Sequence, residues 1–312
     1  MSEQREKVRF ISGQNECAAW HYPGSNGACI VMAGGFAVTK EPATDMFARR
    51  FSESGFTVLA FDYRRLGESG GQPHLVQPVR DMLADWDAAI GCARTLPDVD
   101  RARVAVWGFS ASGGHIFRLA ARDRELAAAI AQTPNADGLA AMRNAARYQK
   151  TRALLRFTAI GIADAAGSLA GRPPRLVPLA GPPGTVAVLT TPDALDAERA
   201  FGGPQSYPDW QRAVAARSAL RLGFYQPGRD ASRVRCPLLV VVCDHDQSSL
   251  AAPAIRAARR APQAEVVRLR GGHYAPFLEQ HERAVEAQLS FLRRHLLAGA
   301  AANATPRSGA RP

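Results

Sequence analysis

The sequence predicts an α/β fold: a mostly parallel central sheet flanked by helices. Continuous apolar runs of strand length, such as residues 104–107, lack the polar alternation of a half-exposed strand. Segments with helical periodicity, such as residues 78–95, lie between these runs. Apolar strands that alternate with helices form a parallel sheet whose two faces are both covered. The 312 residues are enough for one large core or a core with an insertion.

The elements follow one another in a regular order. Alternating patterns predict a hairpin at residues 8–10 and 17–22, which opens the sheet. We expect further strands at residues 28–32, 57–61, 104–107, 127–133, 238–243 and 265–269. We expect helices at residues 44–53, 78–95, 113–122, 252–260 and 279–297. The last residues, 298–312, lack periodicity and are predicted to form a flexible tail.

Residues 136–232 interrupt this alternation. Helical patterns at residues 139–158 and 210–222 are joined by a stretch rich in proline and glycine. The segment is too long for a structureless loop in a compact domain. We therefore expect a helical cap inserted into a core made of residues 1–135 and 233–297. No glycine-rich phosphate-binding loop precedes a helix, which disfavours a dehydrogenase or kinase domain.

Composition narrows the class of protein. With 46% hydrophobic and 21% charged residues, the chain resembles a soluble globular protein, and no apolar run approaches a membrane span. The charged N-terminus does not resemble a signal peptide. Five cysteines without C-x-x-C spacing favour reduced, mostly buried thiols and a cytoplasmic location.

The net charge of +11 comes almost entirely from arginines that are spread along the chain. No long basic run is interleaved with aromatic residues, so we expect a solvated basic surface and no nucleic-acid partner. The sequence leaves open whether the protein forms a homodimer.

The most informative segment for function is the end of the strand at residues 104–107. Here Ser110 lies among small residues, between an apolar strand and a helical pattern. A serine on such a sharp strand-to-helix turn is typical of a nucleophile elbow of the G-x-S-x-G type. The fifth position is Ser112 instead of glycine, and a serine at this place could also act as a helix N-cap.

A serine nucleophile needs a base and an orienting acid. Among seven histidines, His273 lies in a loop beyond the carboxyl end of a strand, the edge where open α/β sheets bind ligands. His115 lies on the helix directly after Ser110, and we interpret it as a packing residue. Asp244 and Asp246 follow another strand at the same edge, and Asp246 has the better reach. These two carboxylates beside a histidine could instead bind a metal, but there is no second histidine at the spacing of a metal ligand, so we disfavour a metal site.

Two backbone N–H groups would complete the site by stabilising a negatively charged carbonyl oxygen. The residue after the serine, Ala111, should supply one. The glycine-rich turn at residues 33–37 should supply the other, and Phe36 is our candidate.

With Ser110, Asp246 and His273 in this order, the chain resembles the α/β-hydrolase superfamily over roughly residues 5–297. Within this superfamily, the chain looks like the branch with serine-aminopeptidase-like or dienelactone-hydrolase-like lids. Residues 61–71, Phe-Asp-Tyr-Arg-Arg-Leu-Gly-Glu-Ser-Gly-Gly, are similar to the family's D-Y-R-G-x-G-x-S turn. Cys236 and Pro237 begin a segment similar to its acid strand.

The chain departs from the family pattern at four positions. Gly34 stands where the family usually has histidine in its oxyanion turn, and Arg65 where it often has glycine. Ser112 replaces glycine in the elbow, and Cys243 replaces glycine before the acid. None of these removes a catalytic group, but Gly34 could alter the oxyanion geometry.

The resemblance implies a serine hydrolase that cleaves a carboxylic ester or thioester through an acyl-enzyme, without cofactor or metal. The substrate would be a small molecule with an apolar acyl or aryl group. Candidate binding residues are the aromatic side chains Trp210, Phe224, Tyr225 and Tyr274. An acyltransferase with an alcohol acceptor and a binding protein with a silent triad are the alternatives. Haloalkane dehalogenase and epoxide hydrolase chemistry is disfavoured, because those relatives use aspartate where this chain has Ser110.

Overall fold

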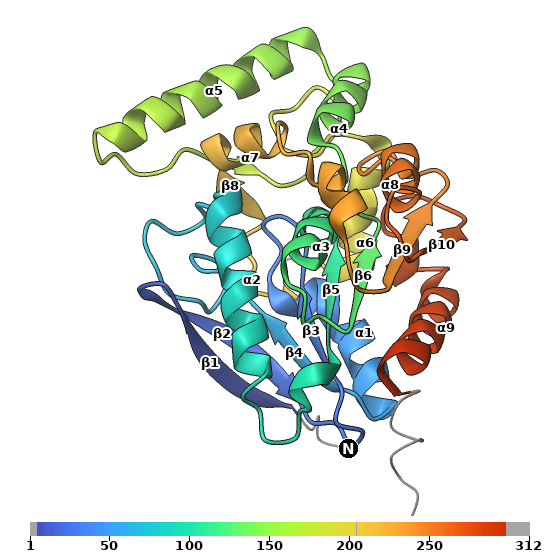
Figure 1. The fold of residues 1–312 in the computed structure, drawn as a ribbon. Coiled ribbons are helices and arrows are strands. Elements are labelled where there is room, and N and C mark those ends of the chain that lie inside the picture. Colours follow the sequence, from blue (N-terminus) through green and yellow to red (C-terminus); the bar gives the residue numbers. More distant parts are fainter. Residues whose placement is uncertain (1–4, 204, 298–312) are drawn as a thin grey trace, which may run out of the picture.

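The computed structural model describes residues 5–203 and 205–297, and its centre is an eight-stranded sheet (Figure 1). The strand order is β1-β2-β4-β3-β5-β6-β9-β10. The strands are β1 (Glu6–Ser12), β2 (Asn15–Tyr22), β3 (Cys29–Ala33), β4 (Thr57–Phe61), β5 (Val104–Phe109), β6 (Ala128–Gln132), β9 (Leu238–Cys243) and β10 (Ala264–Leu269). β1–β2 and β2–β4 pair antiparallel, and the other neighbours pair parallel. The predicted α/β fold with a mostly parallel sheet is confirmed.

Helices cover both faces of the sheet, which explains why its central strands are continuous apolar runs. Every residue of β3, β4, β5, β6 and β9 is buried. The covering helices are α1 (Lys40–Glu53), α2 (Val79–Ala93), α3 (Ala111–Arg122), α8 (Ala251–Ala258) and α9 (His281–Leu292). α1 and α9 contact each other on one face, and α2, α3 and α8 lie on the other (Figure 1). The last helix ends in a π-helical turn, Arg293–Leu297.

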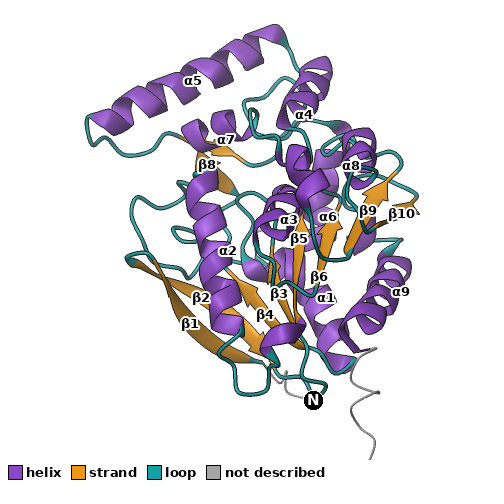
Figure 2. Cartoon of the chain, viewed as in Figure 1, coloured by secondary structure: helices purple, strands orange, loops and turns teal. Residues whose placement is uncertain are grey.

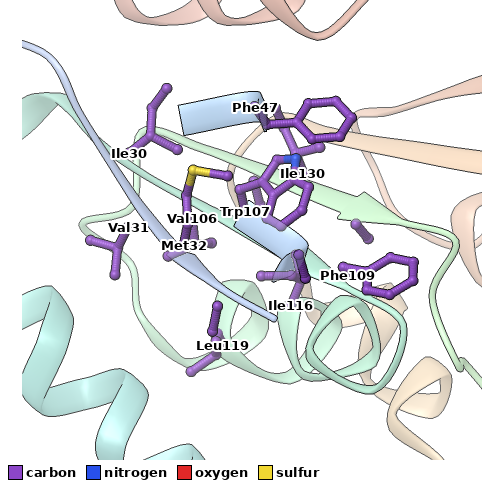
Figure 3. Close-up of a cluster of buried hydrophobic side chains, with 14 of the residues drawn as sticks. Ile30, Val31, Met32, Phe47, Val106, Trp107, Phe109, Ile116, Leu119 and Ile130 are labelled. Atoms are coloured by element: carbon purple, nitrogen blue, oxygen red, sulfur yellow. The ribbon is translucent and has the colours of Figure 1, made fainter. Parts of the chain in front are cut away.

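The core packs against both faces of β5, the strand that leads to Ser110. Trp107 and Phe47 lie on one side of this strand, with ring centroids 5.3 Å apart, and Ile116 and Leu119 lie on the other (Figure 3). The buried indole Nε1 of Trp107 donates a hydrogen bond to Gln288 at 2.7 Å. The core therefore holds β5 from both faces, and the residue that follows it has a rigid support.

Between β6 and β9 the chain forms a layer of helices beyond the carboxyl edge of the sheet (Figure 2). Its elements are α4 (Gly138–Ala145), η2 (Ala146–Tyr148), α5 (Thr151–Leu169), β7 (Leu176–Pro178), η3 (Pro192–Asp196), α6 (Ala197–Phe201), β8 (Ala213–Ala215), α7 (Ala216–Leu222) and η4 (Pro227–Arg233). β7 and β8 pair as a small antiparallel sheet. We keep residues 136–232 as our proposed cap, and the predicted tail at 298–312 lies outside the described residues.

Two of the expected cap helices differ from the sequence interpretation. Residues 139–158 form α4, η2 and the first part of α5, because the side chain of Gln149 accepts the N–H of Lys150 and of Gly184 at the break. Within residues 210–222, strand β8 begins at Ala213 and the chain becomes helical only at Ala216. The carboxylate of Asp164 accepts the N–H of Arg217 at 2.9 Å and fixes this second start.

The turn after β4 explains one departure from the family pattern. Arg65 has a φ of +66°, a left-handed conformation that favours glycine. Its N–H donates to the carbonyl of Gly70, its carbonyl accepts the N–H of Leu75, and its guanidinium pairs with Asp81 at 2.9 Å. These three interactions hold a non-glycine residue in a conformation that it rarely adopts.

A buried ion pair anchors the same turn to α2. The carboxylate of Asp85 is fully buried and accepts the backbone N–H and the Nε–H of Arg64, at 3.0 and 2.6 Å. Asp85→Ala leaves the guanidinium without its charged partner, so we expect it to lower the free energy of unfolding by about 3 kcal/mol. Asp87→Ala, on the same helix, breaks an exposed pair with Arg122 and should cost less than about 1 kcal/mol. Urea unfolding of both variants tests this, and equal losses would contradict it.

Candidate active site

Ser110 lies between β5 and α3 with a φ of +58° and a ψ of −114°, a strained backbone conformation for a residue with a side chain. Its N–H donates to Gln132, and its carbonyl accepts the N–H groups of Gly114 and Asn135. A Cβ added to Gly108 would lie 2.5 Å from the backbone of Ser112, so this position requires glycine. The local sequence therefore forces the sharp turn and exposes the Ser110 hydroxyl at the sheet edge.

His273 connects Ser110 to Asp246. It lies between β10 and the short helix η5 (Ala275–Phe277) and is only 1% exposed. Its Nε2 lies 3.0 Å from Ser110 Oγ, and its Nδ1 lies 2.7 Å from Asp246 Oδ2. Because the carboxylate can only accept, Nδ1 carries the proton and Nε2 is free to accept the hydroxyl proton of Ser110. The ring of Phe109 packs against the imidazole at 4.9 Å.

The structure separates the two aspartates that the sequence left as candidates. Asp246 is buried after β9, and its other oxygen accepts the N–H of Ser249 at 2.6 Å. Asp244 instead pairs with Arg268 at 2.7 Å on the surface. Only Asp246 of these two contacts His273.

A further carboxylate, Asp193 of η3, lies behind the histidine and was missed by the sequence analysis. It is 8% exposed, and its Oδ2 accepts the backbone N–H groups of Gln247, Ser248 and His273 at 2.7, 3.2 and 3.3 Å. Its Oδ1 accepts the hydroxyl of Ser248 at 2.9 Å. Asp193 lies in an irregular stretch of the cap, so no spacing pattern could have connected it to the site.

These carboxylates set the protonation of His273. Burial lowers its pKa, but the charge and hydrogen bond of Asp246 and the charge of Asp193 outweigh burial and hold the pKa above its ordinary value. Burial also raises the pKa of Asp193, but His273 and the donated hydrogen bonds reverse this and hold it below its ordinary range. Asp193 is therefore ionised at neutral pH.

The two residues predicted to supply backbone N–H groups lie at the same cavity as Ser110. Phe36 and Ala111 both line it, and among the described residues neither N–H has a hydrogen-bond acceptor. The next N–H, that of Ala37, donates to Gln77. A Cβ added to Gly35 would lie 3.3 Å from the Cβ of Ser110, so glycine at this position lets the loop approach the serine closely.

Ser112 and Gly34, two departures from the family pattern, meet in one hydrogen-bonded chain. Trp86 Nε1 donates to the hydroxyl of Tyr63 at 2.7 Å, Tyr63 bonds Ser112 Oγ at 2.5 Å, and Ser112 donates to the carbonyl of Gly34. A Cβ added to Gly34 would lie only 3.1 Å from the carbonyl of Val38, so the turn is tightly packed. The Ser112 hydroxyl thus fixes the loop that carries Phe36.

Of the four predicted binding aromatics, only Tyr274 lines the cavity at Ser110. Trp210 lies elsewhere and donates its indole N–H to the carbonyl of Ala37, which supports the loop from the cap side. Phe224 is 64% exposed. The hydroxyl of Tyr225 bonds Nδ1 of His115 at 3.1 Å. Burial and the nearby arginines lower the pKa of that histidine to about 3, so it is a neutral packing residue.

The cavity continues from Ser110 under the cap. A second, larger space with a mostly apolar lining, partly open to solvent, lies beneath α4, α5 and α7. The two spaces share the lining residues Asn135, Val188, Leu189, Leu222 and Ser248. The residues that line only this second space include the apolar side chains of Met142, Leu154, Phe157 and Leu220. A ligand whose reacting atom lies at the Ser110 hydroxyl therefore has room for an apolar group beneath the proposed cap.

Two kinds of feature are absent from residues 5–203 and 205–297. No group of three or more histidine, cysteine, aspartate or glutamate side chains there could hold a metal ion. No helix there is both long and apolar enough to cross a membrane.

Comparisons with known proteins agree with this fold. A family model described as "Alpha/beta hydrolase family" matches residues 30–288. The chain is 37% identical over 292 residues to the quorum-quenching protein AidA of Acinetobacter baumannii, covering 92% of this chain and 94% of AidA. It is 33% identical over 117 residues to a thiohydrolase of Eupenicillium brefeldianum, covering 37% of this chain and 38% of that protein.

A third relative links sequence and structure. The polyketide transferase grgF of Penicillium is 32% identical over 119 residues, covering 38% of this chain and 40% of the relative. The crystal structure of the alpha/beta hydrolase GrgF from Penicillium superposes with a TM-score of 0.78 at 22% identity, covering 94% of this chain and 99% of GrgF. Together with the match over residues 30–288, these findings show that the chain belongs to the alpha/beta hydrolase family.

Proposed function

We propose that this protein is a serine hydrolase that cleaves a carboxylic ester or thioester of an apolar acyl or aryl group. One observation carries the proposal: the hydrogen-bond chain from Asp246 through His273 to Ser110 ends at an apolar cavity. The relative named a thiohydrolase supports the thioester arm, and the family supports hydrolysis in general.

The first half of the proposed reaction acylates the serine. Ser110 Oγ attacks the carbonyl carbon while His273 Nε2 takes the hydroxyl proton. Asp246 stabilises the imidazolium that forms. The negative charge on the carbonyl oxygen accepts hydrogen bonds from the N–H groups of Phe36 and Ala111. His273 then gives its proton to the leaving alcohol or thiol, and an acyl-serine ester remains.

The second half releases the acid. A water molecule attacks the acyl-serine as His273 Nε2 takes its proton, and the same two N–H groups stabilise the second tetrahedral intermediate. The proton then passes from His273 to Ser110 Oγ, and the carboxylic acid leaves. The apolar space beneath α4, α5 and α7 would hold the acyl or aryl group, with Tyr274 near the reacting carbon. We retain Tyr274 as a candidate binding residue and not Trp210, Phe224 or Tyr225.

Acyl transfer to an alcohol is the second candidate, favoured by the relative named a polyketide transferase. The same acyl-serine would form, and an alcohol would replace water in the second half. Product analysis of one activated ester, with and without added alcohols, separates the two. A new ester that accumulates in place of the acid, at alcohol concentrations too low to compete with water non-enzymatically, would favour the transferase.

The Ser110 hydroxyl should react covalently with a fluorophosphonate probe, because only an activated serine attacks phosphorus at a useful rate. We expect labelling of the wild type and loss of at least about 99.9% of esterase activity in Ser110→Ala. Mass spectrometry of the labelled peptide identifies the modified residue. Ser168→Ala, which removes a cap serine that donates to a main-chain carbonyl, serves as the control. A Ser110→Ala variant labelled as strongly as the wild type would sink the hydrolase proposal and leave the binding-protein alternative.

Activity should fall on the acid side of neutrality. His273 accepts a proton from Ser110 only when its imidazole is neutral, and the neighbouring carboxylates hold its pKa above the ordinary value. We therefore expect kcat/KM to rise with pH through a single acidic limb whose midpoint lies above about 6.5. A pH profile with an activated ester measures this, and a midpoint below 6 would contradict it.

Ser112→Ala should slow the reaction without blocking substrate binding. The change removes the donor to the Gly34 carbonyl and loosens the loop that carries the Phe36 N–H. Loss of one direct oxyanion donor costs a hundredfold or more, so for this indirect effect we expect kcat to fall about tenfold with KM within about twofold. Steady-state kinetics tests this against the same Ser168→Ala control. A kcat equal to that of the wild type would show that the Ser112 hydroxyl does not matter for catalysis.

A further inference from the structure

We propose that Asp193 of the cap is a positioning residue that ties the Asp246 loop to the His273 loop and supplies a second negative charge to the histidine. The proposal rests on the function proposed above, because it concerns the base of that reaction. It assigns to the cap a part in the catalytic machinery, in addition to covering the cavity.

The carboxylate of Asp193 accepts hydrogen bonds from two different loops. Oδ2 accepts N–H groups from Gln247 and Ser248, the two residues after Asp246, and also from His273. Asp246 and His273 are thus joined twice, once directly through their side chains and once through the carboxylate of Asp193. Asp193, a residue of the proposed cap, therefore holds together the loop after β9 and the loop after β10 at the edge of the sheet.

The surroundings of Asp193 are shaped for this contact. A Cβ added to Gly272 would lie 3.1 Å from the Cβ of Asp193, so the missing side chain lets the carboxylate approach the histidine loop. Thr191 Oγ1 bonds Ser248 Oγ at 2.7 Å, and that hydroxyl donates to Asp193 Oδ1. Among the described residues, Asp193 forms no ion pair with lysine or arginine. Three backbone N–H groups and the hydroxyl of Ser248 hydrogen-bond its carboxylate instead.

The groups that face His273 come from several elements. Asp246 follows β9, Asp193 lies on η3, and Ser110 follows β5. Tyr274 is adjacent, and burial raises its pKa so that it stays neutral. Glu279 lies beside Gly271, and among the described residues neither it nor any lysine or arginine is paired with His273. The two aspartates are therefore the charges that decide how readily the imidazole takes a proton.

Asp193→Asn separates the charge from the geometry. The amide oxygen can accept the same three backbone N–H groups, and the amide nitrogen can donate to Ser248 Oγ. Without the negative charge, the imidazolium form of His273 loses part of its stabilisation. We expect the acidic limb of kcat/KM to move to lower pH, by on the order of one unit, with KM within about twofold. Asp193 does not line the cavity, which is why KM should hold.

Asp193→Ala also removes the hydrogen-bond acceptor of three backbone N–H groups, two of them buried and that of Gln247 partly buried. We expect kcat to fall about tenfold or more below that of Asp193→Asn, again with little change in KM. Gly272→Ala keeps the charge but pushes it away, and should move the acidic limb in the same direction as Asp193→Asn. If the variants at position 193 fail to fold, Gly272→Ala still tests whether the position of the Asp193 charge affects the acidic limb. Asp196→Asn, on the same short helix, removes a charge that pairs with Arg199 and should leave the limb in place.

The experiment is a set of pH profiles with one activated ester, alongside fluorophosphonate labelling. An acidic limb that moves in Asp193→Asn and not in Asp196→Asn supports the proposal. An unmoved limb in folded Asp193→Asn, or in Gly272→Ala if the former does not fold, overturns it. A wild type without Ser110-dependent labelling or turnover overturns the proposed function instead, so the two failures are distinguishable.

Discussion

The site depends on one backbone constraint, the left-handed conformation of Ser110. A residue with a side chain holds a φ of +58° only if its surroundings leave it no alternative. Here β5 is fixed in the core by Trp107, and Gly108 allows α3 to begin against the end of the strand. The hydrogen bonds of Ser110 to Gln132 and Asn135 close the turn from the neighbouring strand. The strain is thus held by packing over the whole sheet edge.

The parallel sheet then brings the other groups to the same place. Carboxyl ends of parallel strands meet at one edge, so β3, β5, β9 and β10 deliver the loop of Phe36, Ser110, Asp246 and His273 together. The proposed cap adds a hydrogen bond that supports this edge of the sheet from outside. Trp210 holds the loop of Phe36 through the Ala37 carbonyl. Residues from distant segments of the chain are therefore held in fixed positions relative to one another.

The sequence was sufficient for those parts of the site that follow from local pattern. Strands buried on both faces are continuous apolar runs, and a serine among small residues after such a run signals a turn; both were visible without coordinates. What could not be predicted involves contacts across layers. Nothing in the residues around Asp193 marks it as a partner of His273, and the tie between Ser112 and Gly34 spans 78 positions. The roles of the aromatic side chains of the proposed cap could not be predicted either. Trp210 and Phe224 are both aromatic residues in the same segment of the sequence, but the first is buried against the Ala37 carbonyl and the second is exposed.

Two buried carboxylates around one imidazole would be unfavourable if they were left without hydrogen bonds. Asp246 accepts bonds from Ser249 and His273, and Asp193 accepts four, so the desolvation of each is offset by fixed donors. With a neutral histidine the site carries two negative charges and no compensating cation among the described residues. Transfer of a proton to His273 relieves this imbalance. In the proposed reaction that transfer accompanies the attack of Ser110, so the electrostatic arrangement favours the charge distribution of the transition state over that of the resting enzyme.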